Sequence, residues 1–209
     1  MSDPAAAVLE LAHWRGVVSR LYADVRRASE TSPAAAWEAF RAGRDSLLKT
    51  HSQSPLDASQ KRRFVGLDYF PYNPGLRFRS PVRPLPAEVR RDHVVVELAE
   101  GALRYRPFAT AAVDGGTLTL FWMEGYGGGL FLPFRDLTNG HETYGGGRYL
   151  YDTIKGADPG AGNGEIVLDF NFAYNPSCAY SPRWACPLSP PQNALPVRLD
   201  AGERAFTMG

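Results

Sequence analysis

The sequence predicts an α+β fold that is mainly β, with two N-terminal helices packed outside an antiparallel β-barrel or β-sandwich. Over residues 4–50 apolar residues recur at every third or fourth position, which is the period of a helix. Over residues 64–200 β-branched and aromatic residues form short segments separated by turn-forming residues, which is typical of strands. With 209 residues and no polar linker, the chain is expected to form a single domain, residues 1–209.

The two helices are predicted by their start signals and by one apolar stripe each. Asp3 and Ser32 are N-cap residue types, and each precedes a proline at the first helical position. Because a helix buries its apolar face, we expect these helices, within residues 1–50, to cover one side or one end of the sheet. A partner-binding or dimer-forming role is the alternative. The stripes comprise Leu11, Trp14, Val18, Leu21 and Val25 in the first helix and Trp37, Phe40, Leu47 and Leu48 in the second.

The strand region has spacers too short for crossover helices, so its strands are expected to pair mainly in the antiparallel sense. Asp114-Gly115-Gly116 separates two strand candidates and predicts a hairpin. Residues 148–154 and 165–172 are consecutive strand candidates joined by turn-forming residues, and they are expected to pair as a second hairpin. Residues 173–193 are rich in proline and lack a helix or strand pattern. Such a long loop more often has a function, for example as a lid.

Charge and hydropathy exclude several classes of partner. The formal net charge is +1, so the sequence lacks the basic character of proteins that bind nucleic acids or acidic membranes. No apolar run approaches the length of a membrane span, and the N-terminus lacks the basic and apolar regions of a secretory signal. A cytoplasmic location and a small-molecule ligand are therefore expected. A homodimer is compatible with the sequence.

One short stretch, "FRDLTNGHETYGGGRYLYDTIKG", combines charged, aromatic and glycine residues. Gly146 and Gly147 allow positive φ and close backbone approach, and successive amides in such a turn can bind an anion. Arg148 would add a bidentate guanidinium for a carboxylate or a phosphate. The alternative is a bulge at the start of a strand, with Arg148 paired to Glu142 or Asp152. Since neither Gly-Lys-Ser/Thr nor a helix follows, the stretch is not a P-loop or a dinucleotide-binding motif.

A second block, "DFNFAYNPSCAYSPRWACPLSPPQN", begins with alternating polar and aromatic residues. In a strand, Asp169 and Asn171 would face one way, and Phe170 and Phe172 would face the other. Aromatic residues on one face indicate a core, and polar residues on the opposite face suit the lining of a pocket in a small barrel. A solvent-exposed polar face is the alternative.

Three segments of the sequence resemble a known family. The segments "FLPFRDLTNGHETYGGGRYL" and "LDFNFAYNPSCAYSPRWACPLSPPQNALPVRLDAGE" look like the bacterial and archaeal family named domain of unknown function sixteen eighty-four (DUF1684). The segment "SPLDASQKRRFVGLDYFPYNP" is similar to an earlier part of that family. The resemblance spans nearly the whole chain and implies one domain with two signature blocks. It implies no reaction.

Cys178 and Cys186 lie in the C-terminal loop at a spacing that matches neither a zinc ribbon nor a C-x-x-C redox motif. A structural zinc site would need two further ligands, and His141 is the only histidine in the signature blocks. We therefore expect no metal and no other cofactor. The sequence leaves open whether the cysteines are buried small residues, a disulfide, metal ligands or a catalytic thiol.

These patterns predict an enzyme of small-molecule metabolism that uses no redox chemistry. Arg148 and the glycine turn would bind an anionic metabolite, and Glu142 or Asp169 would act as the acid or base of a hydrolytic, lyase or isomerase step. A flavin- or haem-linked split-barrel protein, with the aromatic loop beside the ring system, is one alternative. A non-catalytic ligand-binding module is the other.

The ligand is expected to lie in one cavity. A guanidinium that points inward needs a counter-charge, so Asp169 or Glu142 is the expected partner of Arg148. Arg148, Tyr144, Asp169 and Asn171 are expected to line this cavity together. The full set of predicted ligand-binding residues is Tyr144, Gly146, Gly147, Arg148, Asn171, Tyr174 and Asn175.

Overall fold

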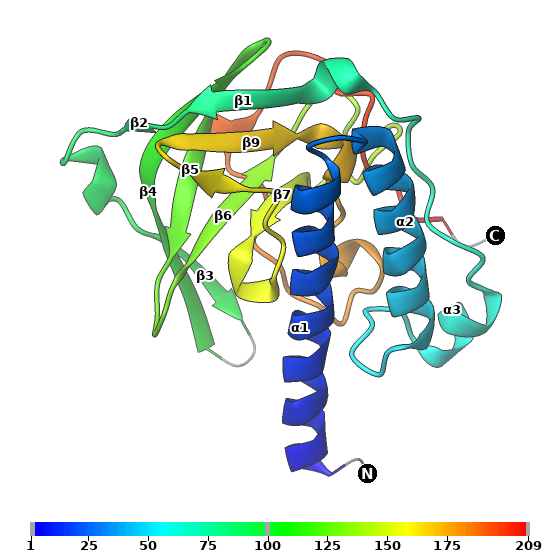
Figure 1. The fold of residues 1–209 in the computed structure, drawn as a ribbon. Helices are drawn as coiled ribbons and strands as arrows, with labels where there is room; N and C mark the ends of the chain where they lie inside the picture. The colour runs from blue at the N-terminus through cyan, green and yellow to red at the C-terminus, as the bar shows by residue number, and fades with distance from the viewer. Residues whose placement is uncertain (1–2, 99–100, 208–209) are drawn as a thin grey trace.

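The computed structural model describes residues 3–98 and 101–207, and Figure 1 shows their fold. Helices α1 (Pro4–Ala28) and α2 (Pro33–Thr50) form where the sequence predicts them. The side chain of Asp3 caps α1 by accepting a hydrogen bond from the backbone amide of Ala5 at 2.9 Å. The two helices lie side by side and cover one side of the β structure.

A short third helix, α3 (Ala58–Arg63), is missing from the sequence-based prediction. A capping box starts it: the side chain of Asp57 accepts from the amide of Gln60, and the side chain of Gln60 accepts from the amide of Asp57, both at 2.8 Å. The pattern Asp-x-x-Gln was the signal that could have predicted it. None of the described helices is both long and apolar enough to cross a membrane.

The larger sheet has six strands in the order β2-β4-β5-β6-β7, with β3 paired to β4. The strands are β2 (Arg83–Pro84), β3 (Val94–Leu98), β4 (Gly101–Val113), β5 (Gly116–Met123), β6 (Gly129–Phe134) and β7 (Arg148–Asp152). All their pairings are antiparallel, as predicted. The predicted hairpin at Asp114 is confirmed, because Val113 pairs with Gly116 and Gly115 adopts a φ of 88° in the turn.

The smaller sheet contains β1 (Arg77–Pro81), β8 (Ala161–Gly162) and β9 (Glu165–Asp169), in the order β1-β9-β8. The predicted hairpin between residues 148–154 and 165–172 is wrong, because β7 pairs with β6 whereas β9 pairs with β1 and β8. The connecting segment contains its own turn. Asn163 and Gly164 have φ values of 53° and 77°, and a type I′ turn requires two such positive values. This turn closes the short β8–β9 hairpin and separates β9 from β7.

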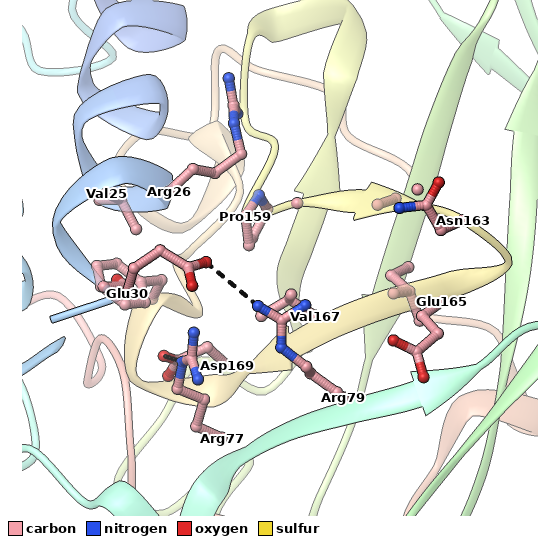
Figure 2. A pocket seen from close by; sticks show the side chains of 16 residues that line it. Val25, Arg26, Glu30, Arg77, Arg79, Pro159, Asn163, Glu165, Val167 and Asp169 are labelled. Carbon is pink, nitrogen blue, oxygen red and sulfur yellow. Dashed lines mark hydrogen bonds and ion pairs between the residues drawn. The ribbon is translucent and has the colours of Figure 1, made fainter.

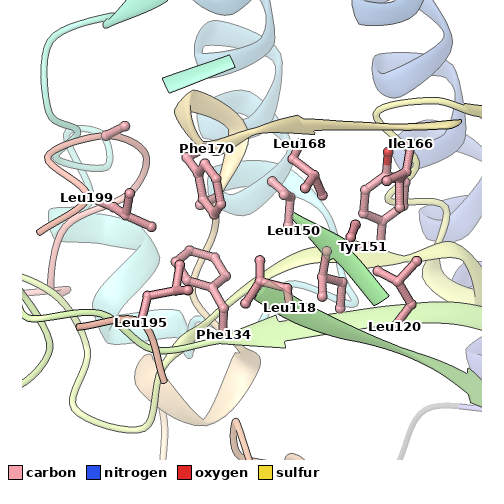
Figure 3. Packing of buried hydrophobic residues seen from close by; sticks show 14 of the residues in the cluster. Leu118, Leu120, Phe134, Leu150, Tyr151, Ile166, Leu168, Phe170, Leu195 and Leu199 are labelled. Atoms are coloured by element: carbon pink, nitrogen blue, oxygen red, sulfur yellow. The ribbon is translucent and has the colours of Figure 1, made fainter. Parts of the chain in front are cut away.

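The main hydrophobic core lies between the two sheets (Figure 3). Leu118, Leu120 and Leu150 come from the larger sheet, and Ile166 and Leu168 come from the smaller one. Neither sheet closes on itself among the described strands. The fold is therefore α+β, with two open and mainly antiparallel sheets.

A second cluster of buried residues joins the helices to the β structure. Tyr22 of α1 and Trp37 and Phe40 of α2 pack there against Phe172, and the ring centroids of Phe40 and Phe172 are 5.1 Å apart. Burial of this aromatic surface is a major favourable contribution to folding. The expected role of the two helices as a cover is confirmed.

The strand alternation expected over residues 169–172 is wrong. Strand β9 ends at Asp169, whose side chain accepts a hydrogen bond from the amide of Asn171 at 3.1 Å, and Phe170–Phe172 form a 3₁₀ turn. Phe170 therefore enters the core between the sheets, whereas Phe172 enters the cluster under the helices. The loop at 173–193 is confirmed, since its helical segments are only two short 3₁₀ turns.

Candidate functional site

A pocket of about 200 Å³ lies where the C-terminal end of α1 meets the smaller sheet (Figure 2). Three arginines and three acidic residues contribute to its wall. Such a pocket offers cationic groups that can bind an anion and carboxyl groups that can exchange protons. The charged lining residues are Arg26, Arg77, Arg79, Glu30, Glu165 and Asp169.

The alternation of β1 explains how two of the arginines reach the pocket. Side chains two residues apart in a strand lie on the same face, so Arg77 and Arg79 share one face. Phe78, between them, packs against the core between the sheets. Arg26 reaches the same space from the last turn of α1, and its neighbour Val25 is buried in the cluster under the helices.

Asp169 is a buried carboxyl group at this pocket, and its two oxygen atoms have different surroundings. Oδ1 accepts hydrogen bonds from the backbone amide and the side-chain Nδ2 of Asn171, at 3.1 and 2.8 Å. Oδ2 lies 3.3 Å from Nε of Arg77 but has no hydrogen-bond donor among residues 3–98 and 101–207. Burial raises the pKa of Asp169, and the bonds from Asn171 and the charge of Arg77 oppose that rise. The group therefore suits proton transfer.

Each pocket arginine forms an ion pair with a carboxylate of the same chain. Arg77 pairs with Asp169, Arg79 lies 3.2 Å from Glu30, and Arg26 lies 3.4 Å from Asp158. The Arg79–Glu30 pair is open to solvent, with side chains 52% and 64% exposed. Exposed ion pairs contribute little to stability, so a ligand anion could replace Glu30 at Arg79 at small cost.

Arg148 has a different environment from the one predicted. Its guanidinium is fully buried, and Nη2 donates to Oδ2 of Asp136 at 2.8 Å and to the backbone oxygen of Leu199 at 3.2 Å. Nη1 donates to the backbone oxygen of Ala201. The predicted pairing of Arg148 with Asp169 or Glu142 is therefore wrong. These contacts occupy the guanidinium within the fold, and they explain why it stays charged although burial lowers its pKa.

The glycine turn before Arg148 is packed against the protein and does not form an open anion nest. The amide of Gly147 donates to the backbone oxygen of Tyr144 at 3.1 Å, and Gly147 has a φ of 91°. A Cβ atom on Gly147 would lie 2.6 Å from the backbone oxygen of Phe134. One on Gly146 would meet the ring of Tyr144 at 2.5 Å. These glycines are required by close packing.

Comparisons with known proteins place the chain in a family. A family model described as "Protein of unknown function (DUF1684)" matches residues 62–204. The chain belongs to the DUF1684 family. No curated protein matches it. A solution NMR structure of the uncharacterised protein from gene locus rrnAC0354 of Haloarcula marismortui is 35% identical to it, with a TM-score of 0.57, and the match covers 80% of this chain and 91% of that chain.

Of the residues predicted to bind a ligand or to react, only Asp169 lines the pocket between α1 and the smaller sheet. Asn171 donates hydrogen bonds to Asp169 and also fixes the backbone of Asn73. Its Oδ1 accepts from the backbone amide of Asn73 at 2.8 Å, and its Nδ2 donates to the backbone carbonyl of Asn73 at 2.9 Å. Tyr174 and Asn175 line a separate pocket of about 60 Å³ beneath the helices. Glu142 lies elsewhere and pairs with Arg198 at 2.8 Å, and this hydrogen bond lowers its pKa.

The cavity predicted for Arg148, Tyr144, Asp169 and Asn171 is therefore not formed. Strands β7 and β9 belong to different sheets, so Arg148 and Asp169 have separate partners. The sequence reasoning missed Arg77, Arg79 and Arg26. The period-two pattern Arg77-Phe78-Arg79 was an available signal for β1, but the contribution of α1 depends on tertiary packing.

One cluster, formed by Glu10, His13 and His51, has spacing suited to a metal ion, since its ligand atoms lie within 4.8 Å of one another. The backbone amide of Gln53 donates to Nδ1 of His51 at 3.1 Å, so the proton of neutral His51 is on Nε2. Nε2 lies 2.9 Å from Nδ1 of His13, which can accept that proton in a hydrogen bond. A metal-bound histidine normally donates from its other ring nitrogen, which His51 cannot do here. A histidine–histidine hydrogen bond explains the cluster better.

Proposed function

We propose that this member of the DUF1684 family is a β-sandwich protein that binds a small anionic metabolite and acts on it by acid–base chemistry without redox change. The site is the pocket between α1 and the smaller sheet. The observation that carries the proposal is the buried carboxyl of Asp169 beside Arg77, in a pocket that also contains Arg26 and Arg79. Arginine is the side chain best suited to bind carboxylate and phosphate groups.

The division of roles follows from exposure. Arg79 and Arg26 are 52% and 38% exposed and would meet the ligand first. Arg77 is 24% exposed and would contact both the ligand and Asp169. If the ligand attracts Arg77, Oδ2 of Asp169 loses its cation and can give or take a proton at the bound molecule. The pocket volume of about 200 Å³ suits a small ligand.

A binding test with matched variants addresses the proposal. Thermal unfolding and calorimetry would be measured with inorganic phosphate, small mono- and dicarboxylates and sugar phosphates. We expect R79Q to weaken binding of the best anion by about 10-fold or more, since a hydrogen bond to a charged group contributes ~1.5–3 kcal/mol. R83Q is the control, because Arg83 is exposed and outside the pocket. Equal affinity in wild type and R79Q, or no binding by any of these anions, would contradict the proposed site.

The flavin-linked alternative is favoured by one observation. A second pocket, of about 440 Å³, lies over β4 and β5 and is lined by Trp122 and Phe108 together with Arg90 and Arg106. Aromatic walls with nearby guanidinium groups suit a planar anionic ring system. The absorbance spectrum of the purified protein separates the two candidates: a yellow or red protein favours this alternative, and the first proposal requires a colourless one.

A further inference from the structure

Cys178 and Cys186 lie together although eight positions separate them. The turn Ser177–Ala179 directs the backbone amide of Cys178 toward Cys186, and that amide donates to Sγ of Cys186 at 3.4 Å. Both cysteines are free and half-buried. The backbone of one cysteine therefore contacts the sulfur of the other, which brings the two residues together within the loop.

The glycine turn of the first signature block supplies a third group. The hydroxyl group of Tyr144 lies 3.6 Å from Sγ of Cys178. The charge of the Lys155 ammonium group favours the thiolate form of both cysteines. Together with burial, the two sulfur atoms in turn help to raise the pKa of the nearby phenol of Tyr149. Tyr149 is in turn fixed by a hydrogen bond from its hydroxyl to the backbone oxygen of Pro187, next to Cys186. The two signature blocks of the family therefore meet at this thiol pair.

The surroundings make the two thiols unequal. Hydrogen bonding by Cys186 is the largest influence on Cys178, and with that of Tyr144 it lowers the pKa of Cys178 to about 6, although burial opposes this. The hydrogen bond to Cys178 and burial raise the pKa of Cys186 above its ordinary value. Desolvation and the bond to Cys178 raise the pKa of Tyr144 to about 12, so Tyr144 stays a donor. These opposite directions favour the thiolate on Cys178, beside the hydroxyl group of Tyr144, and the thiol on Cys186.

We propose that Cys178 and Cys186 form a peroxide-reactive dithiol, in which Cys178 is the nucleophile, Cys186 resolves the oxidised product, and Tyr144 positions the Cys178 sulfur. This activity is separate from the pocket of Asp169 and does not depend on it.

The chemistry balances with a hydroperoxide as the oxidant. The Cys178 thiolate attacks one oxygen of the hydroperoxide, the O–O bond breaks, and the leaving oxygen takes a proton from solvent to form an alcohol or water. Cys178 becomes a sulfenic acid. The sulfur of Cys186 then attacks the sulfur of Cys178, the S–O bond breaks, and the proton of Cys186 leaves with the hydroxyl group as water. The two thiols lose two electrons in total, and one hydroperoxide is reduced.

The first test uses the full chain, fully reduced and treated with hydrogen peroxide at pH 7. Intact mass and peptide mapping should show one intramolecular Cys178–Cys186 disulfide that dithiothreitol reverses. In C186S, dimedone should trap a sulfenic acid on Cys178, whereas C178S should be oxidised at least tenfold more slowly. Preferential oxidation of Cys186, or wild-type and C178S chains that react equally slowly, would overturn the proposal.

A second test examines the positioning role of Tyr144. The rate of Cys178 alkylation by iodoacetamide would be measured against pH in the C186S background and in the wild type, each with and without Y144F. We expect Y144F to shift the midpoint of the wild-type rate profile upward, because it removes a hydrogen bond to the thiolate, while the unfolding temperature stays close to that of wild type. Y144F retains the ring that packs against Gly146, so a merely structural role predicts an unchanged midpoint. That outcome would remove Tyr144 from the proposed site.

Discussion

Arg77 and Arg148 are both paired with a buried carboxylate, but only Arg77 is accessible. Arg148 is fully buried with Asp136, whereas Arg77 keeps 24% of its side chain exposed at a pocket. The sequence correctly indicated that an inward-pointing Arg148 needs a counter-charge. The partner could not be chosen from sequence, since Asp136, Glu142, Asp152 and Asp169 are all nearby along the chain or in a neighbouring block. The three-dimensional path of the chain decides among them, and it places Asp136 beside Arg148.

Replacing Arg148 tests its role in the fold. R148A should lower the free energy of unfolding by about 3–5 kcal/mol, because it leaves Asp136 and backbone carbonyls buried without their donor. R198A is the control, and it should change stability far less, since Arg198 forms only partly exposed ion pairs. Urea unfolding at pH 7 measures both values. Similar losses in the two variants would contradict a stabilising role for the buried pair.

The titration of Asp169 is a second test at the residue scale. Its pKa is raised in the folded protein, so its neutral form favours folding: this contribution is complete below the ordinary pKa of aspartate and is lost as pH rises through the folded value. R77Q should raise the pKa further, because Arg77 stabilises the carboxylate. Carbon-13 NMR titration of the Asp169 carboxyl in wild type and R77Q measures the difference. A lower pKa in R77Q would contradict the ion pair.

At the scale of elements, the sequence predicted those whose signals are local. Helices α1 and α2 and the β4–β5 hairpin combine clear caps, period or turn residues. The β7–β9 pairing failed because Asn163-Gly164 closes a shorter hairpin with β8, and β1, which precedes β9 by more than eighty residues, occupies its other edge. Such non-local pairing leaves no local pattern. The candidate pocket was missed for the same reason, since α1, β1 and β9 meet only in the folded chain.

Contact between α1 and the end of α2 should depend on pH. His13 of α1 and His51 after α2 share a hydrogen bond, with Glu10 and Lys61 as the charged groups nearby. Burial lowers the pKa of His51, so neutral His51 favours folding: this contribution is present above about pH 6.5 and is lost as pH falls through the folded pKa. Wild-type stability should therefore decrease more steeply than that of H51Q between pH 7.5 and pH 5. Parallel curves from urea unfolding would show that the pair does not sense pH.

At the scale of the whole molecule, the helices and the region matched by the family model depend on each other. The match begins at residue 62, after α1 and α2. Yet α2 donates a hydrogen bond from Nε1 of Trp37 to the backbone oxygen of Asn171 at 3.1 Å, and Asn171 holds Asp169. The helices also bury Phe172 and Tyr180. The matched region therefore contains Asp169, while the preceding helices cover its core and complete the pocket beside it.

Removing residues 1–50 tests this dependence. The shortened chain should expose the aromatic cluster that the helices cover, and burial of one large aromatic residue alone is worth ~1.5–3 kcal/mol. We expect it to bind a hydrophobic dye, to unfold without a cooperative transition and to lose any stabilisation by anions. R79Q in the full chain is the control, because it should lose anion binding and still unfold cooperatively. A shortened chain that unfolds cooperatively near the wild-type temperature would show that the β structure is stable alone and that α1 and α2 are an accessory cover.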